Sequence, residues 1–115
     1  MTGGEETHRS AYRSMWLFVM FDLPVDDKAA RKAYSYFHKA LIREGFTMLQ
    51  FSVYARFHAS EEAAATKKRR LRALIPPRGQ VRFLAVSDRQ FGKMEIHAGK
   101  NWEKPEEPPE QLTFF

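Results

Sequence analysis

A single acidic residue, Asp22, stands where the most apolar segment of the chain ends. Residues 15–21 are all apolar, and Asp22 follows them directly, before Leu23 and Pro24. A hard cation such as Mg²⁺ prefers oxygen ligands and keeps several waters, so one or two carboxylates hold it. Bound Mg²⁺ polarises a phosphodiester and lowers the pKa of a coordinated water. Asp22 is therefore a candidate magnesium ligand and catalytic residue; the alternative is that it only ends a strand and caps the turn at Pro24.

Basic side chains recur along the segment after Asp22. A cationic helix face suits sequence-independent contacts with the phosphates of duplex DNA, and such contacts weaken steeply with salt. Arg78, beside Gly79, and Arg82 are further candidates for phosphate contacts. The candidates on the predicted helix, all off its apolar stripe, are Lys28, Arg31, Lys32, Lys39 and Arg43.

The charge of the chain is unevenly distributed. Residues 1–100 carry 18 Lys and Arg against 10 Asp and Glu, whereas residues 101–115 carry one Lys against four Glu. A basic body suits a polyanionic partner such as nucleic acid. A second basic run, residues 67–70, occupies four consecutive positions that point around most of a helix. That run is equally compatible with a solvated helix face.

The residue types argue against several other kinds of functional site. There is no Cys, which removes disulfides, thiolate zinc sites and cysteine nucleophiles, and the four His lack metal-ligand spacing. No Gly-rich phosphate loop is present. RNA-recognition motifs stack bases on strand aromatics, but their signature is absent around Gly45. We therefore expect core packing rather than base stacking from the strand aromatics Trp16, Phe18, Phe21, Phe51 and Phe83.

The spacing of apolar residues predicts the element order β-α-β-β-α-β. Asp26 or Asp27 is expected to cap the first helix, Gly45 to end it, and Ser60 to cap the second. Prolines 76 and 77 end the second helix. The predicted elements are a strand over 15–21, a helix over 28–44, two strands within 46–57 that meet near residues 50–52, a helix over 61–75, a strand over 81–86 and a short strand within 91–97.

This order is typical of an α+β, ferredoxin-like fold, with both helices on one face of an antiparallel sheet. We expect a leader over residues 1–13, the folded domain over 14–100, and an acidic, Pro-containing tail over 101–115. The first strand is apolar on both sides, so the second face of the sheet needs a cover. A second copy of the chain is the simplest cover, and the chain's own C-terminal strand is the alternative. In such a homodimer, two Asp22 carboxylates would share one Mg²⁺ ion.

No segment is long enough to cross a membrane. The longest apolar run has seven residues, whereas a helical span needs roughly 20. The first ten residues are polar and charged and lack the apolar stretch of a signal peptide. We expect a soluble, cytoplasmic protein without a membrane partner.

Three segments, in this order and spacing, resemble the CRISPR-associated protein two family. The likeness covers roughly residues 14–98, and the stretches 47–54 and 90–92 are most similar to members from type II CRISPR systems. The segments are the apolar strand ending in Asp22-Leu23-Pro24, residues 45–47 leading into 50–54, and residues 81–88 followed by Gln90-Phe91-Gly92.

The resemblance implies a ferredoxin-like homodimer that takes part in spacer acquisition. In that family the dimer bridges two dimers of the integrase subunit, CRISPR-associated protein one, and the heterohexamer holds a short DNA duplex for insertion. Members are also described as metal-dependent nucleases acting on DNA or on RNA, including single-stranded RNA. The acidic residue that closes the first strand is their Mg²⁺ ligand, and here that residue is Asp22.

Two alternatives of other classes stay open. One is a stand-alone, toxin-like endoribonuclease, which would act without an integrase. The other is a ferredoxin-like regulatory domain that binds a small molecule, which would have no need of a doubled basic surface. Complex formation with the integrase separates the first alternative from a scaffold, and affinity for polyanions separates the second.

Overall fold

The structure is a computed structural model that describes residues 13–109. Residues 1–12 of the expected leader and 110–115 of the expected tail lie outside the described residues. None of the described helices is long and apolar enough to cross a membrane. The elements are β1 (Met15–Asp22), α2 (Lys28–Arg43), β2 (Thr47–Gln50), β3 (Val53–His58), α3 (Glu61–Arg72), β4 (Gln80–Ser87), α4 (Asp88–Gly92), β5 (Ile96–Ala98) and β6 (Asn101–Glu103).

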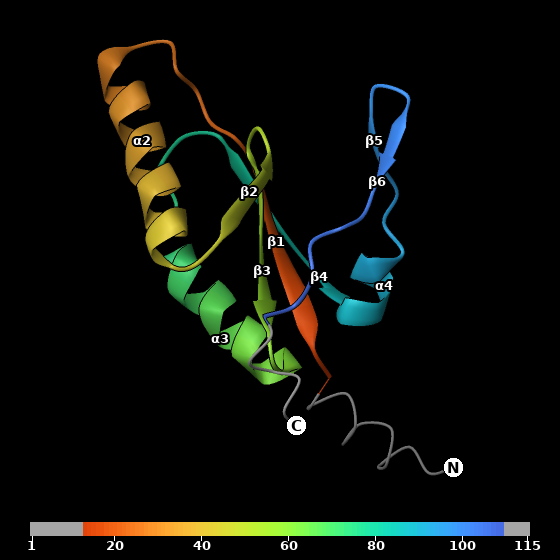
Figure 1. Cartoon of the computed structure of the whole chain (residues 1–115). Helices are drawn as coiled ribbons and strands as arrows, with labels where there is room; N and C mark the ends of the chain where they lie inside the picture. Colours follow the sequence, from red (N-terminus) through yellow and green to blue (C-terminus); the bar gives the residue numbers. More distant parts are fainter. Residues whose placement is uncertain (1–12, 110–115) are drawn as a thin grey trace.

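Four strands form one antiparallel sheet in the order β2-β3-β1-β4. The long helices α2 and α3 lie together on one side of this sheet (Figure 1). The arrangement confirms the predicted α+β, ferredoxin-like fold. The central strand β1 pairs with β3 on one side and β4 on the other, so both of its edges are satisfied and Asp22 is carried to one end of the sheet.

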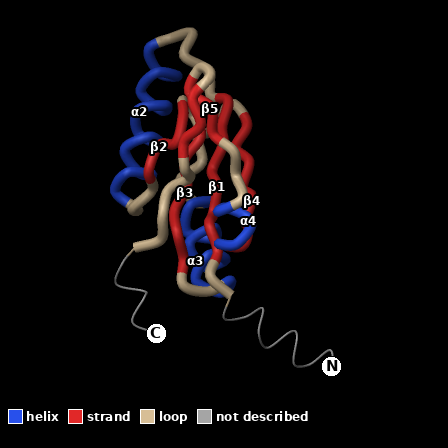
Figure 2. Tube along the Cα trace, turned by 45° about the vertical axis from the view of Figure 1, so that its right-hand side comes forward, coloured by secondary structure: helices blue, strands red, loops and turns tan. Residues whose placement is uncertain are grey.

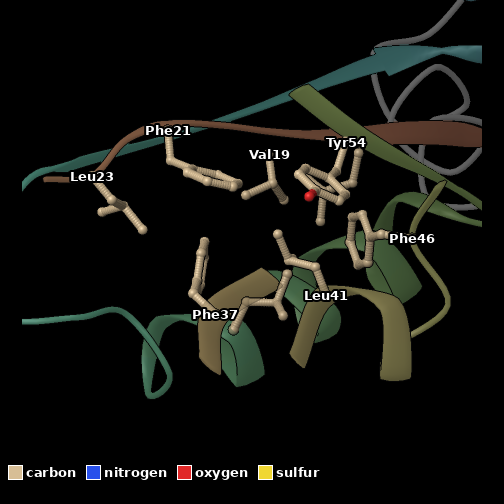
Figure 3. Close-up of a cluster of buried hydrophobic side chains, with 9 residues drawn as sticks. Val19, Phe21, Leu23, Phe37, Leu41, Phe46 and Tyr54 are labelled. Carbon is tan, nitrogen blue, oxygen red and sulfur yellow. The ribbon is translucent and has the colours of Figure 1, made fainter. Parts of the chain in front are cut away.

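The main core fills the space between the sheet and the two long helices. Alternate residues of β1, among them Val19 and Phe21, point toward Phe37 and Leu41 of α2 (Figure 3). Full burial of each such side chain contributes about 1.5–3 kcal/mol. As predicted, the Asp27 side chain caps α2 by accepting a 2.7 Å hydrogen bond from the Ala30 backbone. The core therefore fixes the side of α2 that faces the sheet and leaves its other side to solvent.

The opposite face of the sheet carries neither of the two long helices and is called the helix-free face below; the short helix α4 covers it at one end. The ring of Phe91 in α4 stacks on Trp16 with centroids 4.0 Å apart, and the Trp16 indole donates a 2.8 Å hydrogen bond to Asp88. Figures 1 and 2 show the sheet between α2 and α4. Farther along this face Leu84 is 51% exposed. Within residues 13–109, the C-terminal part of the chain thus covers the Trp16 end of the helix-free face and leaves Leu84 half exposed.

The C-terminal part of the domain differs from the sequence prediction. The short strand predicted within residues 91–97 is confirmed in part, because β5 begins at Ile96. Phe91 instead lies in α4, because Ser87 and Gln90 form a capping box that starts a helix there. The strand β5 follows later and pairs with β6, which the sequence did not predict, rather than with the main sheet. Helix α3 also ends at Arg72, earlier than predicted: the Leu74 and Ile75 N–H groups donate to the carbonyls three residues back, at Leu71 and Arg72, in turns tighter than an α-helix.

A buried histidine gives the fold a predicted pH dependence. His58 is buried, its Nδ1 lies 3.1 Å from the Arg56 carbonyl, and burial together with the Arg56 charge lowers the pKa of His58 from 6.5 to about 4. As the pH falls below 6.5, the unfolded chain therefore binds a proton at this histidine before the folded chain does, and this favours unfolding. We expect the free energy of unfolding to drop by about 2 kcal/mol between pH 7 and pH 5.

Urea unfolding of the protein at several pH values measures this drop. His58→Gln should flatten the pH dependence in that window, whereas His97→Gln, at an exposed histidine, should leave it unchanged. An unfolding free energy of the wild-type chain that stays constant from pH 7 to pH 5 would contradict the assignment of a neutral, buried His58.

Candidate nucleic-acid and metal site

Asp22 is the last residue of β1, and its side chain is exposed. It pairs in register with Gln80 of β4. Side chains along β1 alternate between the two faces of the sheet, so Asp22 lies on the same face as Trp16 and Phe18, the helix-free face. A shallow cavity of about 240 Å³ opens beside it. The cavity is lined by Met20, Phe21, Asp22, Phe51, Ser52, Val53, Gln80 and Arg82.

Two backbone features hold Asp22 in place. The Phe21 backbone N–H donates a 3.1 Å hydrogen bond to the Ser52 carbonyl, which ties the end of β1 to the β2–β3 turn. On the other side Gly79 has φ +93°, and a Cβ there would approach the Asp22 carbonyl oxygen to 2.6 Å. Only glycine permits this close approach without strain. Nothing in the sequence around Gly79 signals this contact.

The oxygen donors at this end of the sheet suit Mg²⁺ only in part. Asp22 supplies one carboxylate, and Gln80 and Ser52 supply neutral oxygens in the same cavity. Among residues 13–109 no three His, Cys, Asp or Glu residues gather as a metal cluster. Since Mg²⁺ keeps several waters, this set fits an ion held mostly through water, and a second copy of Asp22 would complete it.

Helix α2 presents a continuous cationic face. Lys28, Lys32, Lys39 and Arg43 are all exposed, and their spacings of four, seven and four residues place them along one side of the helix. This side is turned away from the buried Phe37. The structure therefore brings together four of the five candidates predicted on this helix.

The remaining basic candidates lie elsewhere. Arg31 is exposed beside the row and donates a 3.2 Å hydrogen bond to the Val25 carbonyl. Arg78 pairs with Asp26 at 3.3 Å and Asp27 at 3.4 Å, so two carboxylates balance its charge. Arg82 is exposed on β4, where it lines the Asp22 cavity. Within one chain, the α2 row and Arg82 thus lie on opposite sides of the sheet.

Part of the second basic run has a structural role. Lys67 and Arg70 of α3 contact the Glu44 carboxylate at 2.7 Å and 2.9 Å, and the Glu44 side chain is only 8% exposed. Hydrogen bonds from Lys67 and Arg70 lower the pKa of Glu44. This cluster joins the end of α2 to α3. Sequence reasoning missed it because the partners are far apart in the chain and no local pattern links them.

Glu44→Gln is expected to lower the free energy of unfolding by about 1–3 kcal/mol, because the hydrogen bonds to a charged group disappear and two cations keep no counterion. The lowered pKa of Glu44 means that its contribution is present above pH 4.5 and disappears as the pH falls further. Urea unfolding at pH 7 measures the effect. Glu95→Gln, at an exposed carboxylate, is the matched control, and equal unfolding free energies for the two variants would contradict the role of Glu44.

A larger hollow, of about 910 Å³, lies away from Asp22, between the β2–β3 edge and α3. Two of its cations, Lys67 and Arg70, are already engaged by Glu44. Glu106 and Glu107 also line it and add negative charge. Its size therefore does not make it the better site for a polyanion, and the Asp22 cavity remains the candidate site for phosphodiester cleavage.

The histidines within the described residues have packing or surface positions. His38 shares a hydrogen bond with Tyr54 inside the fold, and His58 is buried against Arg56. His97 is exposed and lies 3.3 Å from Glu95. None of these three histidines lines the Asp22 cavity.

Comparison with known proteins shows which family the chain belongs to. The profile of the family described as "CRISPR associated protein Cas2" matches residues 15–94, which span β1 to the end of α4. The chain belongs to the Cas2 family. The expectation drawn from the sequence segments is thereby confirmed.

Relatives named "CRISPR-associated endoribonuclease Cas2" cover nearly the whole chain. The Parvibaculum lavamentivorans protein is 46% identical over 101 residues, which is 88% of this chain and 100% of the relative. The Flavobacterium psychrophilum protein is 41% identical over 109 residues, 95% of each chain. The Paracidovorax avenae protein is 39% identical over 106 residues, 92% of this chain and 98% of the relative. The likeness to Cas2 proteins thus extends well beyond the first strand.

Proposed function

We propose that this chain is the dimeric, nucleic-acid-binding subunit of a CRISPR spacer-acquisition complex in the cytoplasm. Membership of the Cas2 family and the exposed cationic face of α2 support this role. A row of four Lys and Arg contacts phosphates without reading bases, which suits a subunit that accepts any captured duplex. One dimer bridges two dimers of CRISPR-associated protein one, and its doubled α2 rows hold the duplex between them.

The same dimer is proposed to be a Mg²⁺-dependent endonuclease. Relatives are named endoribonucleases, and the open cavity beside Asp22 is the observation that carries this part of the proposal. Asp22 would hold the ion, together with its copy in the second subunit, and Arg82 would bind a phosphate oxygen of the substrate. Bound Mg²⁺ supplies Lewis-acid activation of the phosphodiester and of the attacking water.

The proposed dimer forms through the uncovered part of the helix-free face. This face carries Leu84, which is half exposed, and Met20, which is half buried and neighbours the Asp22 cavity. Pairing two such faces removes apolar surface from water and leaves both copies of α2 on the outside. The arrangement explains why the acidic site and the cationic row lie on opposite sides of the sheet.

Mixing the purified chain with CRISPR-associated protein one and a short DNA duplex tests the scaffold role. We expect co-elution at one dimer of this chain for two integrase dimers, and duplex insertion that depends on this chain. Failure to co-elute, combined with efficient RNA cleavage by the isolated chain, would instead identify a stand-alone, toxin-like endoribonuclease. Absence of any affinity for polynucleotides at low salt would favour the regulatory-domain alternative.

A further inference from the structure

The aromatic ring of Phe51 is exposed beside the Asp22 cavity. The sequence prediction placed Phe51 in the core, and this is wrong: the residue is 78% exposed. The cause is local, because residues 51 and 52 form the two-residue connection between β2 and β3, so Phe51 lies at the tip of the hairpin rather than within a strand. A large apolar ring at such a tip gains nothing from core packing.

The turn that carries Phe51 is held rigidly. Ser52 has φ +63°, a left-handed conformation that is strained for a residue other than glycine. The Ser52 carbonyl accepts the hydrogen bond from Phe21, and the Ser52 hydroxyl lies 3.3 Å from the Tyr34 hydroxyl. The Phe51 ring lies nearly parallel to that of Tyr34, at 21° and 6.2 Å between centroids. These contacts place the exposed ring beside the end of β1.

The groups around this ring could bind the base and the phosphate of one nucleotide. The cavity of about 240 Å³ joins the Phe51 ring to the Asp22 carboxylate, the Arg82 guanidinium and the Gln80 amide. Flat apolar rings stack on nucleobases, and guanidinium groups bind phosphates. The cavity is smaller than the roughly 300–1,000 Å³ of typical small-molecule pockets, so it suits a single base rather than a larger ligand.

We propose that Phe51 is a stacking platform for one unpaired base of a single-stranded nucleic acid, whose neighbouring phosphate is bound by Arg82. This inference rests on the proposed nuclease function and assigns one residue that positions its substrate. The bases of a duplex are stacked on their neighbours and cannot reach the ring without being flipped out. The α2 row therefore holds duplex DNA, whereas the Asp22 cavity takes a flexible single strand.

Binding of short oligonucleotides to the Asp22→Asn protein separates stacking from cleavage. The probes are single-stranded RNA and DNA of one sequence, each with 2-aminopurine at successive positions, and the corresponding duplex. Phe51→Leu keeps an apolar side chain but removes the ring, and should weaken single-strand binding by roughly 5- to 100-fold. Phe51→Tyr should retain the affinity and the 2-aminopurine quenching. Trp102→Leu, at an exposed aromatic residue on β6, is the matched control and should change neither.

Three results would overturn the proposal. The first is that Phe51→Leu binds the single strand within twofold of the parent. The second is that Phe51→Leu weakens duplex binding as much as single-strand binding. The third is that the loss of single-strand binding coincides with dissociation of the dimer in sedimentation velocity. The last result would assign Phe51 to the interface between two copies. A preference for the RNA or the DNA probe identifies the strand that the site accepts. If the wild-type chain cleaves neither probe with Mg²⁺ while Phe51-dependent binding persists, the nuclease proposal fails and the base-binding site stands.

Discussion

Replacing Asp22 by Asn is expected to lower Mg²⁺-dependent cleavage at least roughly 100-fold, while the chain stays folded and dimeric. The substitution keeps the size of the side chain but removes the charge that attracts the ion. Lewis-acid stabilisation by a bound metal is worth several kcal/mol, and about 1.4 kcal/mol corresponds to a tenfold change in rate. Because Asp22 is exposed and makes no ion pair within the described chain, its replacement should leave the unfolding free energy nearly unchanged.

The measurement is single-turnover cleavage of labelled RNA and DNA at several Mg²⁺ concentrations. Glu95→Gln makes the same chemical change at an exposed carboxylate on the C-terminal side of α4 and should cleave like the wild type. Raising Mg²⁺ should recover part of the activity of Asp22→Asn, because one oxygen ligand remains. An unchanged cleavage rate in Asp22→Asn would show that this residue only ends β1 and turns the chain toward Pro24.

Neutralising the α2 row should reduce affinity for duplex DNA at least roughly 100-fold at physiological salt. The variant combines Lys28→Gln, Lys32→Gln, Lys39→Gln and Arg43→Gln. Each neutralised phosphate contributes about 0.9 to the slope of log affinity against log salt, so the slope should become shallower by about that amount for every phosphate that the variant no longer binds. The reduction should be the same for duplexes of different sequence, because phosphates carry no base information.

A second quadruple variant controls for net charge. It combines Arg89→Gln, Lys93→Gln, Lys100→Gln and Lys104→Gln, which remove the same charge from exposed positions in α4 and the segments around β5 and β6. Filter binding or fluorescence anisotropy at several salt concentrations compares the two. Equal reductions of affinity in both variants would mean that overall charge, rather than the face of α2, attracts DNA.

Local patterns were sufficient to predict most of the fold. The apolar run of β1, the stripe of α2 and the caps at Asp27 and Ser60 involve residues close together in sequence, and the structure confirms them. The β2–β3 turn was also placed correctly. The order of these elements, joined by short connections, then predicts the ferredoxin-like sheet.

Features that depend on distant contacts could not be predicted in this way. The stacking of Phe91 on Trp16 and the burial of Glu44 between two cations join segments that have no shared sequence pattern. Phe51 was assigned to the core because its neighbours are strand-forming, although its position in a two-residue turn exposes it. Sequence identified Asp22 as a candidate, but the cavity and the close approach of Gly79 that surround it emerge only from the packed chain.

Spin-label distances between two copies of the chain test the proposed dimer most directly. The natural sequence contains no Cys, so a single label can be placed at Leu84→Cys on the helix-free face or at Lys39→Cys on α2. If two copies meet face to face and bring their Asp22 carboxylates together, double electron–electron resonance will give a short distance for the label at 84 and a much longer one for the label at 39. A monomer at all accessible concentrations, or a shorter distance at 39 than at 84, would contradict the account.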